Sequence, residues 1–274
     1  MKPLIGVVKP AKGGFGNRLL GYLALRAISR RFEVGYFSLN HVDKKLVRGI
    51  YQRPLVPLRF TTTQIVESVN TNPASLEEQL LLNLRQGSTS VIRGPMLGET
   101  YAFFSDTEID SPDLITFGTC SEYQQISLGH HTAVLHFRSG DFEQWNSRAI
   151  HSENYYHRAI DFISSSASIT QMRICADNYE SVSVKKISAR LAQDGLLAKS
   201  HECRDPFTCD FAAMAGAVVL VASASTYSIT AGLVGGPKVI HSAEWVENRV
   251  RSGETFWRMV SDNVLPNYSV EAIL

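Results

Sequence analysis

Three short stretches of this 274-residue sequence carry groups that could bind a phosphorylated ligand. The first is a glycine turn over residues 13–16 (GGFG), followed by Asn17 and Arg18. Glycines between a strand and a helix let backbone N–H groups approach an anion at the positive end of that helix. A tight turn that binds nothing would explain Gly14 and Gly16 equally well, so this stretch alone does not define a site.

The second stretch is residues 136–142 (HFRSGDF), which directly follow an apolar run over 133–135. Binding groups of parallel sheets collect beyond the carboxyl ends of the strands. An arginine there can hold a phosphate through two parallel hydrogen bonds. Arg138 is therefore a candidate anion ligand. The alternative interpretation is an ion pair between Arg138 and Asp141 that stiffens the loop.

The third stretch runs from Asp210 through an apolar segment over 218–222 to the hydroxyl-rich residues 223–228 (SASTYS). Small hydroxyl residues at a strand-to-helix turn can form a cradle for phosphate or ribose oxygens. Ordinary capping of the following helix by Ser225 or Thr226 is the alternative explanation.

The elements around these stretches alternate between strand and helix, which predicts an α/β fold. A strand over 4–8, the glycine turn, a helix over 17–31 and a strand over 33–39 resemble the opening of a doubly wound sheet. A second series begins at residue 133. Its predicted strands cover 133–137, 172–176, 218–222 and 238–241, and its predicted helices cover 153–164, 181–191, 210–217, 226–233 and 244–260.

Between the two series the pattern is weaker. It predicts a helix over 76–84, strands over 88–92 and 114–117, and a crossing between lobes over 122–131. We therefore expect two Rossmann-like lobes that face a central cleft. The N-terminal lobe would cover residues 1–121, and the C-terminal lobe would cover residues 122–274 and end in a closing helix.

Composition narrows the class of partner. The 27 Lys and Arg residues nearly balance the 26 Asp and Glu residues, which gives a net charge of +1 and argues against a nucleic-acid partner. No apolar run approaches the ~20 residues that span a bilayer, so no integral membrane contact is expected. The four cysteines form no C-x-x-C pair, which favours reduced thiols in a cytoplasmic protein. A bridge between Cys203 and Cys209 is the alternative.

Taken in order, the stretches resemble motifs of the α-1,2-fucosyltransferase and nodulation-type and O-fucosyltransferase superfamily. Residues 13–19 resemble its GGxGNxL turn, and residues 136–142 resemble its HxRRGDY motif. Residues 153–160 match the helix that follows, and residues 174–178 lie where the family ends a strand in F-S-D. Residues 210–228 resemble its D-x-x-x-M…NSTFS segment, so the resemblance covers most of the chain.

The resemblance implies a GT-B-like fold and an inverting, metal-independent transfer from a nucleotide-sugar, usually GDP-fucose, to a glycan acceptor hydroxyl. It also implies that the N-terminal lobe holds the acceptor and the C-terminal lobe holds the nucleotide-sugar donor. No cofactor is expected, since the GDP-sugar is a substrate. Carried over by position, Arg138 would hold the donor pyrophosphate, His136 would lie near the nucleotide, and Asp210 would read the guanine edge. Other donor-site positions implied in the same way are Gly14, Gly16, Asn17, Arg18, Asp177, Ser225 and Thr226.

Some features leave the function open. Ser139 stands where the family has a second arginine, which removes a charge and leaves room for a different donor or a non-catalytic relative. Asp141 and Glu143 are the candidate catalytic bases nearest to the donor motif. A nicotinamide-dependent oxidoreductase is a further alternative, but Leu19 stands where the dinucleotide fingerprint needs a third glycine.

Overall fold

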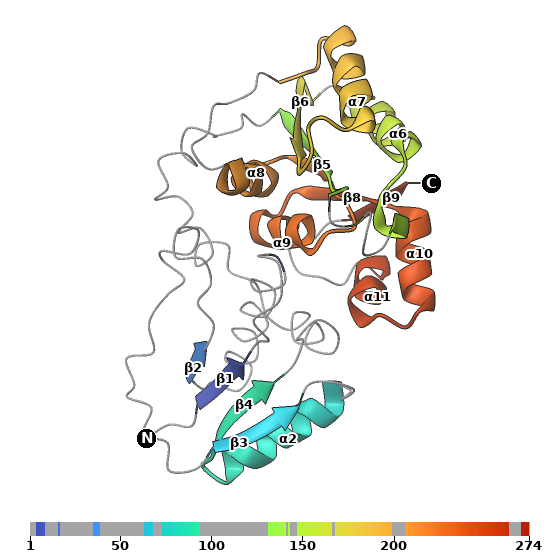
Figure 1. The fold of residues 1–274 in the computed structure, drawn as a ribbon. Helices are drawn as coiled ribbons and strands as arrows, with labels where there is room; N and C mark the ends of the chain where they lie inside the picture. Colours follow the sequence, from blue (N-terminus) through green and yellow to red (C-terminus); the bar gives the residue numbers. More distant parts are fainter. Residues whose placement is uncertain are drawn as a thin grey trace.

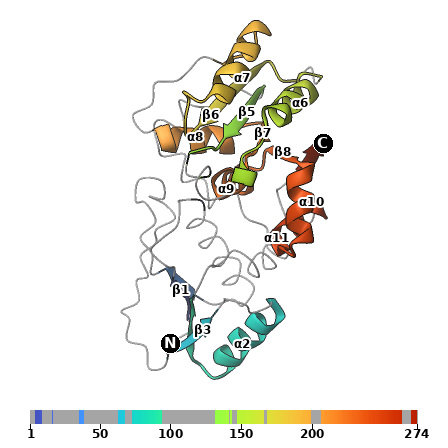
Figure 2. The same cartoon turned by 45° about the vertical axis from the view of Figure 1, so that its right-hand side comes forward.

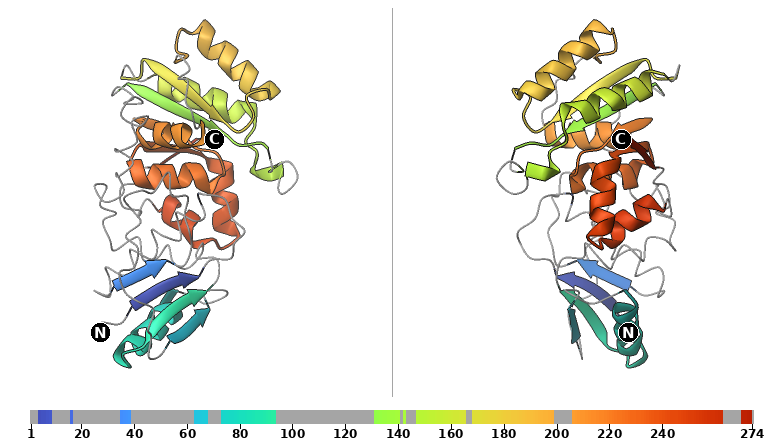
Figure 3. Two further views of the ribbon diagram at one scale, coloured as in Figure 1. Left: turned by 60° about the vertical axis from the view of Figure 1, so that its left-hand side comes forward. Right: turned by 90° about the vertical axis from the view of Figure 1, so that its right-hand side faces the viewer.

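The computed structural model describes residues 4–8, 16, 35–38, 63–67, 73–93, 131–140, 142, 147–165, 168–198, 206–262 and 270–273. Within these residues the chain forms two β-sheets in which every strand pairing is parallel. The two sheets lie toward opposite ends of the molecule (Figures 1 and 3).

The N-terminal sheet has four strands in the order β2-β1-β4-β3. They are β1 (Leu4–Val8), β2 (Gly35–Ser38), β3 (Thr63–Glu67) and β4 (Thr89–Arg93). Helix α2 (Pro73–Arg85) connects β3 to β4, and its Leu80 is fully buried. Strand β3 was not predicted. Its sequence, TQIVE, has only two apolar residues at its centre, too short a run to show a period.

The C-terminal sheet has five strands in the order β6-β5-β7-β8-β9, and all six residues of β5 are buried. Helices α6 and α7 cover one face of this sheet, and α8 and α9 cover the other (Figures 1 and 2). The elements are β5 (Thr132–Phe137), η3 (Ser147–Ala149), α6 (Glu153–Ser164), β6 (Gln171–Ala176), α7 (Val182–Gln193), α8 (Pro206–Ala215), β7 (Val219–Val221), α9 (Thr226–Gly235), β8 (Lys238–Ser242), α10 (Ala243–Arg251), α11 (Thr255–Ser261) and β9 (Val270–Ile273).

The pleat of β5 decides which side chains reach each face. Ala133, Leu135 and Phe137 belong to the hydrophobic core that β5 shares with α6 and α7. Because successive side chains of a strand point to opposite faces, His136 faces the α8–α9 side. This alternation turns a polar strand-end side chain toward the helix that follows β7.

Several predicted elements are confirmed, including α6 with its cap. Ser152 accepts a hydrogen bond from the backbone N–H of Tyr155 at 3.4 Å, and α6 has the predicted bounds. The single closing helix over 244–260 is wrong. It is divided into α10 and α11, because Gly253 adopts a left-handed φ of 82° between them. The sheet then gains a further strand, β9, so the lobe does not end in a helix.

Other predictions fall on residues that the structure does not describe. They are the helix over 17–31, the strand over 114–117 and all but the last residue of the crossing over 122–131. The limits 1–121 and 122–274 therefore stay predictions.

The prediction of reduced thiols holds for Cys175 and fails for Cys209. Cys175 is free and buried, whereas Cys209 in α8 is disulfide-bonded. The cytoplasmic location stays a prediction. None of the described helices is long and apolar enough to cross a membrane.

Candidate functional site

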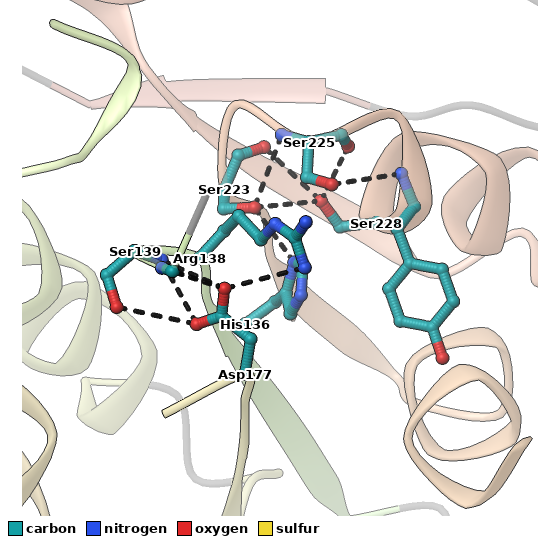
Figure 4. Close-up of polar contacts among 9 residues, drawn as sticks. His136, Arg138, Ser139, Asp177, Ser223, Ser225 and Ser228 are labelled. Carbon is teal, nitrogen blue, oxygen red and sulfur yellow. Dashed lines mark hydrogen bonds and ion pairs between the residues drawn. The ribbon is translucent and has the colours of Figure 1, made fainter. Parts of the chain in front are cut away.

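The candidate site lies where the order of the C-terminal sheet reverses direction. From β5 the chain crosses to β6 on one side and then to β7 on the other. Such a switch point leaves a crevice beyond the carboxyl ends of the two central strands, and ligands of open α/β sheets bind there. His136 lies near the end of β5 and Ser223 lies two residues beyond β7. The His136 Nδ1 and Ser223 Oγ atoms are 2.8 Å apart, so one hydrogen bond spans the switch point (Figure 4).

Strand register explains the charged part of the site. Phe137 at the end of β5 pairs with Ala176 at the end of β6, so Arg138 and Asp177 emerge side by side. An Nη1 atom of Arg138 lies 3.4 Å from an Asp177 carboxylate oxygen. Arg138 also stacks over Phe142, with its guanidinium carbon 5.4 Å from the ring centroid. About a third of the Arg138 side chain, 32%, remains exposed and could contact a ligand.

Asp177 also holds the loop that carries Arg138. The backbone N–H groups of Ser139 and Gly140 each donate to its carboxylate at 3.0 Å (Figure 4). A Cβ at Gly140 would lie 2.8 Å from the same carboxylate, so a glycine allows this close approach. Arg138 is thus paired with Asp177. Asp141, the partner considered from sequence, lies outside the described residues.

The other part of the site is the buried start of α9. Ser225 caps this helix by accepting from the Tyr227 N–H at 3.2 Å, as the capping interpretation predicted. The Ser223 hydroxyl accepts from the Ser225 N–H at 3.3 Å. The Ser228 hydroxyl lies 3.2 Å from the Ser223 carbonyl and 3.1 Å from the Ser225 carbonyl. The serines therefore satisfy each other and the chain, and the positive end of the helix points toward the switch point.

His136 is neutral in this setting. Burial, the nearby Arg138 charge and His151 together lower the pKa of His136 to about 3. The backbone carbonyl of His136 accepts from the Tyr156 hydroxyl at 3.0 Å, which fixes the end of β5 from the opposite face. The Tyr155 hydroxyl lies between the carbonyl oxygens of Ala222 and Ile240, at 2.9 and 2.8 Å, and so contacts the chain at two neighbouring strands.

Gly16 connects the N-terminal glycine turn to this site. A Cβ at Gly16 would lie 2.5 Å from the carbonyl carbon of Thr226 and 2.6 Å from the N atom of Tyr227. The Thr230 hydroxyl lies within hydrogen-bonding distance of the carbonyls of Gly16 and Thr226, at 3.3 Å from the former. Residue 16 must therefore be a glycine for the turn to reach the first turn of α9. Gly14, Asn17, Arg18 and Glu143 lie outside the described residues.

Asp210 lies on the α8 side of the site. Its carboxylate is 3.5 Å from an Nη2 atom of Arg173 and 3.5 Å from the Tyr179 hydroxyl. Burial raises the pKa of Asp210, while Arg173 and Tyr179 act in the opposite direction. Both carboxylate oxygens thus already have a partner in the protein, and reading of a base by Asp210 stays a prediction.

Sequence reasoning missed several residues that shape the site. Ser223 was seen only as part of a hydroxyl-rich run, and Thr230 and Arg173 carried no motif. Tyr227 was also missed, although its ring lies 5.7 Å from that of His136 and 5.4 Å from that of Phe211. A polar residue two positions after a buried strand was the available signal for Ser223.

The fold that carries this site belongs to the mixed α/β, GT-B-like class. A variant of FUT1 from Arabidopsis thaliana in complex with GDP is similar to this chain with a TM-score of 0.52 and 9% sequence identity. The alignment covers 87% of this chain and 70% of that chain. POFUT1 in complex with GDP aligns at 11% identity over 84% of this chain and 94% of that chain, with a TM-score of 0.47. No family model matches the sequence, and no curated protein matches it significantly.

Proposed function

We propose that this chain is a glycosyltransferase that uses a nucleoside diphosphate sugar, most directly GDP-fucose, as its donor. The observation that carries the proposal is the joint placement of Arg138 and the N-terminal end of α9 at the switch point of the C-terminal sheet. Both are groups that bind anionic phosphate oxygens. The fold shared with a plant FUT1 in complex with GDP supports a guanine nucleotide as the donor carrier.

The proposed reaction is a single displacement with inversion. The oxygen of an acceptor hydroxyl forms a bond to the anomeric carbon, and the bond from that carbon to the β-phosphate oxygen breaks. The electron pair stays on the nucleoside diphosphate, and the hydroxyl proton passes to a base. Arg138 and the α9 amides stabilise the charge that develops on the leaving group, an effect worth about 3–4 kcal/mol per well-placed donor.

The catalytic base and the acceptor belong to the same proposal. Asp141 and Glu143 lie three and five residues after Arg138 in the sequence and stay the candidate bases. The acceptor would be a glycan held toward the N-terminal lobe, close to the Gly16 turn. Metal independence is also part of the proposal, since Arg138 can take the role of a cation at the pyrophosphate.

Calorimetric titration of the purified protein with GDP, UDP, ADP and GDP-fucose tests the donor. We expect selective binding of GDP and GDP-fucose in the presence of EDTA, and Arg138→Ala should weaken both by roughly 10- to 100-fold, as for a lost hydrogen bond between charged groups. Arg251→Ala is the matched control, because Arg251 lies on α10 and pairs there with Glu247, both side chains being exposed. Selective UDP binding would show that the donor is a UDP-sugar, and the proposal that the protein is a glycosyltransferase would stand. Absence of binding to every nucleotide would indicate a non-catalytic relative.

A further inference from the structure

The hydroxyl groups around His136 decide which of its ring nitrogens carries the proton. Four atoms take part: His136 Nδ1 and the Oγ atoms of Ser223, Ser225 and Ser228 (Figure 4). His136 is 4% exposed and Ser223 1%, so water does not compete freely for these groups. Each hydroxyl has one proton to donate and two lone pairs that accept. The proton positions can therefore be assigned by following the chain of donors.

The assignment starts at Ser228. Its hydroxyl lies near two carbonyl oxygens, those of Ser223 and Ser225, and a carbonyl can only accept. The Ser228 hydroxyl therefore donates its one proton to a carbonyl oxygen, and it cannot also donate to the Ser223 hydroxyl. The Ser223 hydroxyl already accepts from the Ser225 N–H. Its own proton can go either to His136 Nδ1 at 2.8 Å or to Ser228 Oγ at 3.4 Å.

The Ser223 hydroxyl donates to the nearer acceptor, His136 Nδ1, because a hydrogen bond from a hydroxyl weakens beyond about 3.0 Å. His136 Nδ1 then accepts, and the ring proton of the neutral imidazole must lie on Nε2. Among the described residues, no group is hydrogen-bonded to Nε2. The other tautomer would leave the Ser223 proton with only the long contact to Ser228.

We propose that Ser223 is a positioning residue, which holds His136 as the Nε2–H tautomer so that the ring donates to an oxygen of the bound nucleotide. This role deepens the proposed function and rests on it. His136 and Arg138 lie two residues apart on β5 and its loop, so both would contact the donor from the same strand end. A neutral N–H donor can remain directed at this point because Ser223 prevents the ring from rotating or changing tautomer.

Nitrogen-15 NMR of the histidine-labelled protein without nucleotide tests the tautomer directly. Long-range proton–nitrogen spectra distinguish a protonated Nε2 from a protonated Nδ1, and His136→Gln assigns the signals. We expect Nε2–H in the wild type and a mixture of tautomers in Ser223→Ala. A wild-type ring protonated on Nδ1 would overturn the inference, whatever the variants do.

Calorimetry with GDP then tests the role of the tautomer. We expect Ser223→Ala to bind GDP about tenfold more weakly, as for one misdirected hydrogen bond to a charged ligand. Ser223→Cys keeps the size with a weaker donor and should lie between Ser223→Ala and the wild type. Ser181→Ala is the matched control, because Ser181 caps α7 outside the site.

The outcomes separate the inference from the proposed function. Equal GDP affinity in Ser223→Ala and the wild type, with Nε2–H in the wild type, would overturn the positioning role. A wild-type protein that binds no nucleotide would overturn both the proposed function and the donor contact, while the tautomer would still be decided by the spectra. If Ser223→Ala does not fold, the wild-type spectra alone decide the tautomer, and Ser223→Cys carries the binding comparison.

Discussion

The two sides of the switch point are built on different physical principles. The β5–β6 side is charged and partly exposed: Arg138 and Asp177 form an ion pair, and about a third of the arginine side chain remains exposed. The β7–α9 side is neutral and buried. His136 and the serines at residues 223, 225 and 228 are all at most 6% exposed, and no formal charge lies among them.

The difference indicates that the two sides contribute differently to ligand binding. A charged group that binds an anionic ligand has to be accessible and has to be held in one orientation. Arg138 is partly exposed, and its ion pair with Asp177 fixes the position of its guanidinium. The neutral side contributes direction instead of charge. Buried hydroxyl networks are rigid when every member has a partner, and each of these serines has one. The proposed chemistry needs both sides, since charge without fixed geometry binds a phosphate but does not orient it.

Acid should destabilise the protein through its buried neutral histidines, one of which is His136 on the neutral side, and this is the largest effect we expect. The pKa values of His136 and His241 are lowered to about 3, and that of His151 to about 4, mainly by burial. In the unfolded chain these groups bind protons below pH 6.5. Between pH 6.5 and 4 the unfolded state therefore binds more protons, and the free energy of unfolding falls as the pH falls. Each histidine contributes up to about 1.4 kcal/mol per pH unit.

Urea unfolding at several pH values between 4 and 7 measures this slope. The comparison variant is His241→Asn, which lacks one of the three buried histidines while His136 and the rest of the site stay unchanged. Its slope should be smaller than that of the wild type. A free energy of unfolding that stays constant from pH 7 to pH 4.5 would show that the histidines are not buried in the neutral form.

Gly16→Ala tests the contact that joins the glycine turn to the neutral side, with the second largest effect. The added Cβ would lie 2.5 Å from the Thr226 backbone, so the turn or α9 must move. We expect a loss of about 1–3 kcal/mol in the free energy of unfolding, as for overpacked sites. GDP affinity should fall with it. Gly195→Ala is a useful contrast, because its Cβ would meet nothing within 4 Å and any cost comes from its φ of 69°. Unchanged GDP affinity in Gly16→Ala would separate the turn from the donor site.

The sequence predicted the strand-end positions of the site better than its contacts. Apolar runs bounded by polar residues located β5, β6 and β7, and parallel strands must end at one edge, so His136, Arg138 and Asp177 could be placed together. The partner of Arg138 could not be predicted, because it depends on the register between β5 and β6. Strand register is set by packing over the whole sheet and leaves no local signal.

The contacts of Asp210 and Gly16 could not be predicted for the same reason, because they also depend on packing between distant segments. Asp210 was selected for its place in a motif, but its pairing with Arg173 depends on how α8 packs against β6. The reason for a glycine at residue 16 lies 210 residues away, at Thr226. A contact between two segments so distant in sequence cannot be derived from the periodicity of either one. Gly253 was visible in the sequence, but helical spacing over 244–260 concealed the break that its left-handed backbone makes.

Asp177→Asn separates the two sides of the site most cleanly, with the smallest expected effect. The amide keeps one oxygen acceptor for the Ser139 and Gly140 N–H groups but loses the ion pair with Arg138. We expect the free energy of unfolding to fall by about 1 kcal/mol, which is less than the ~1.5–3 kcal/mol of a buried hydrogen bond to a charged group, because this ion pair is partly exposed. GDP should bind more weakly, because Arg138 loses the partner that directs it. The histidine signals of the neutral side should not change.

Asp194→Asn is the matched control for this variant, because Asp194 also pairs with an arginine, Arg190, at 3.5 Å but lies at the end of α7. Thermal unfolding and GDP calorimetry on both variants measure the two effects separately. Tighter GDP binding in Asp177→Asn would mean that the carboxylate competes with the ligand for Arg138 and does not orient it. A change in the His136 tautomer would mean that the charged and neutral sides are coupled. Within the described part of the chain, Asp177 does not contact the serines at residues 223, 225 and 228, and it could reach them only through Arg138 and β5.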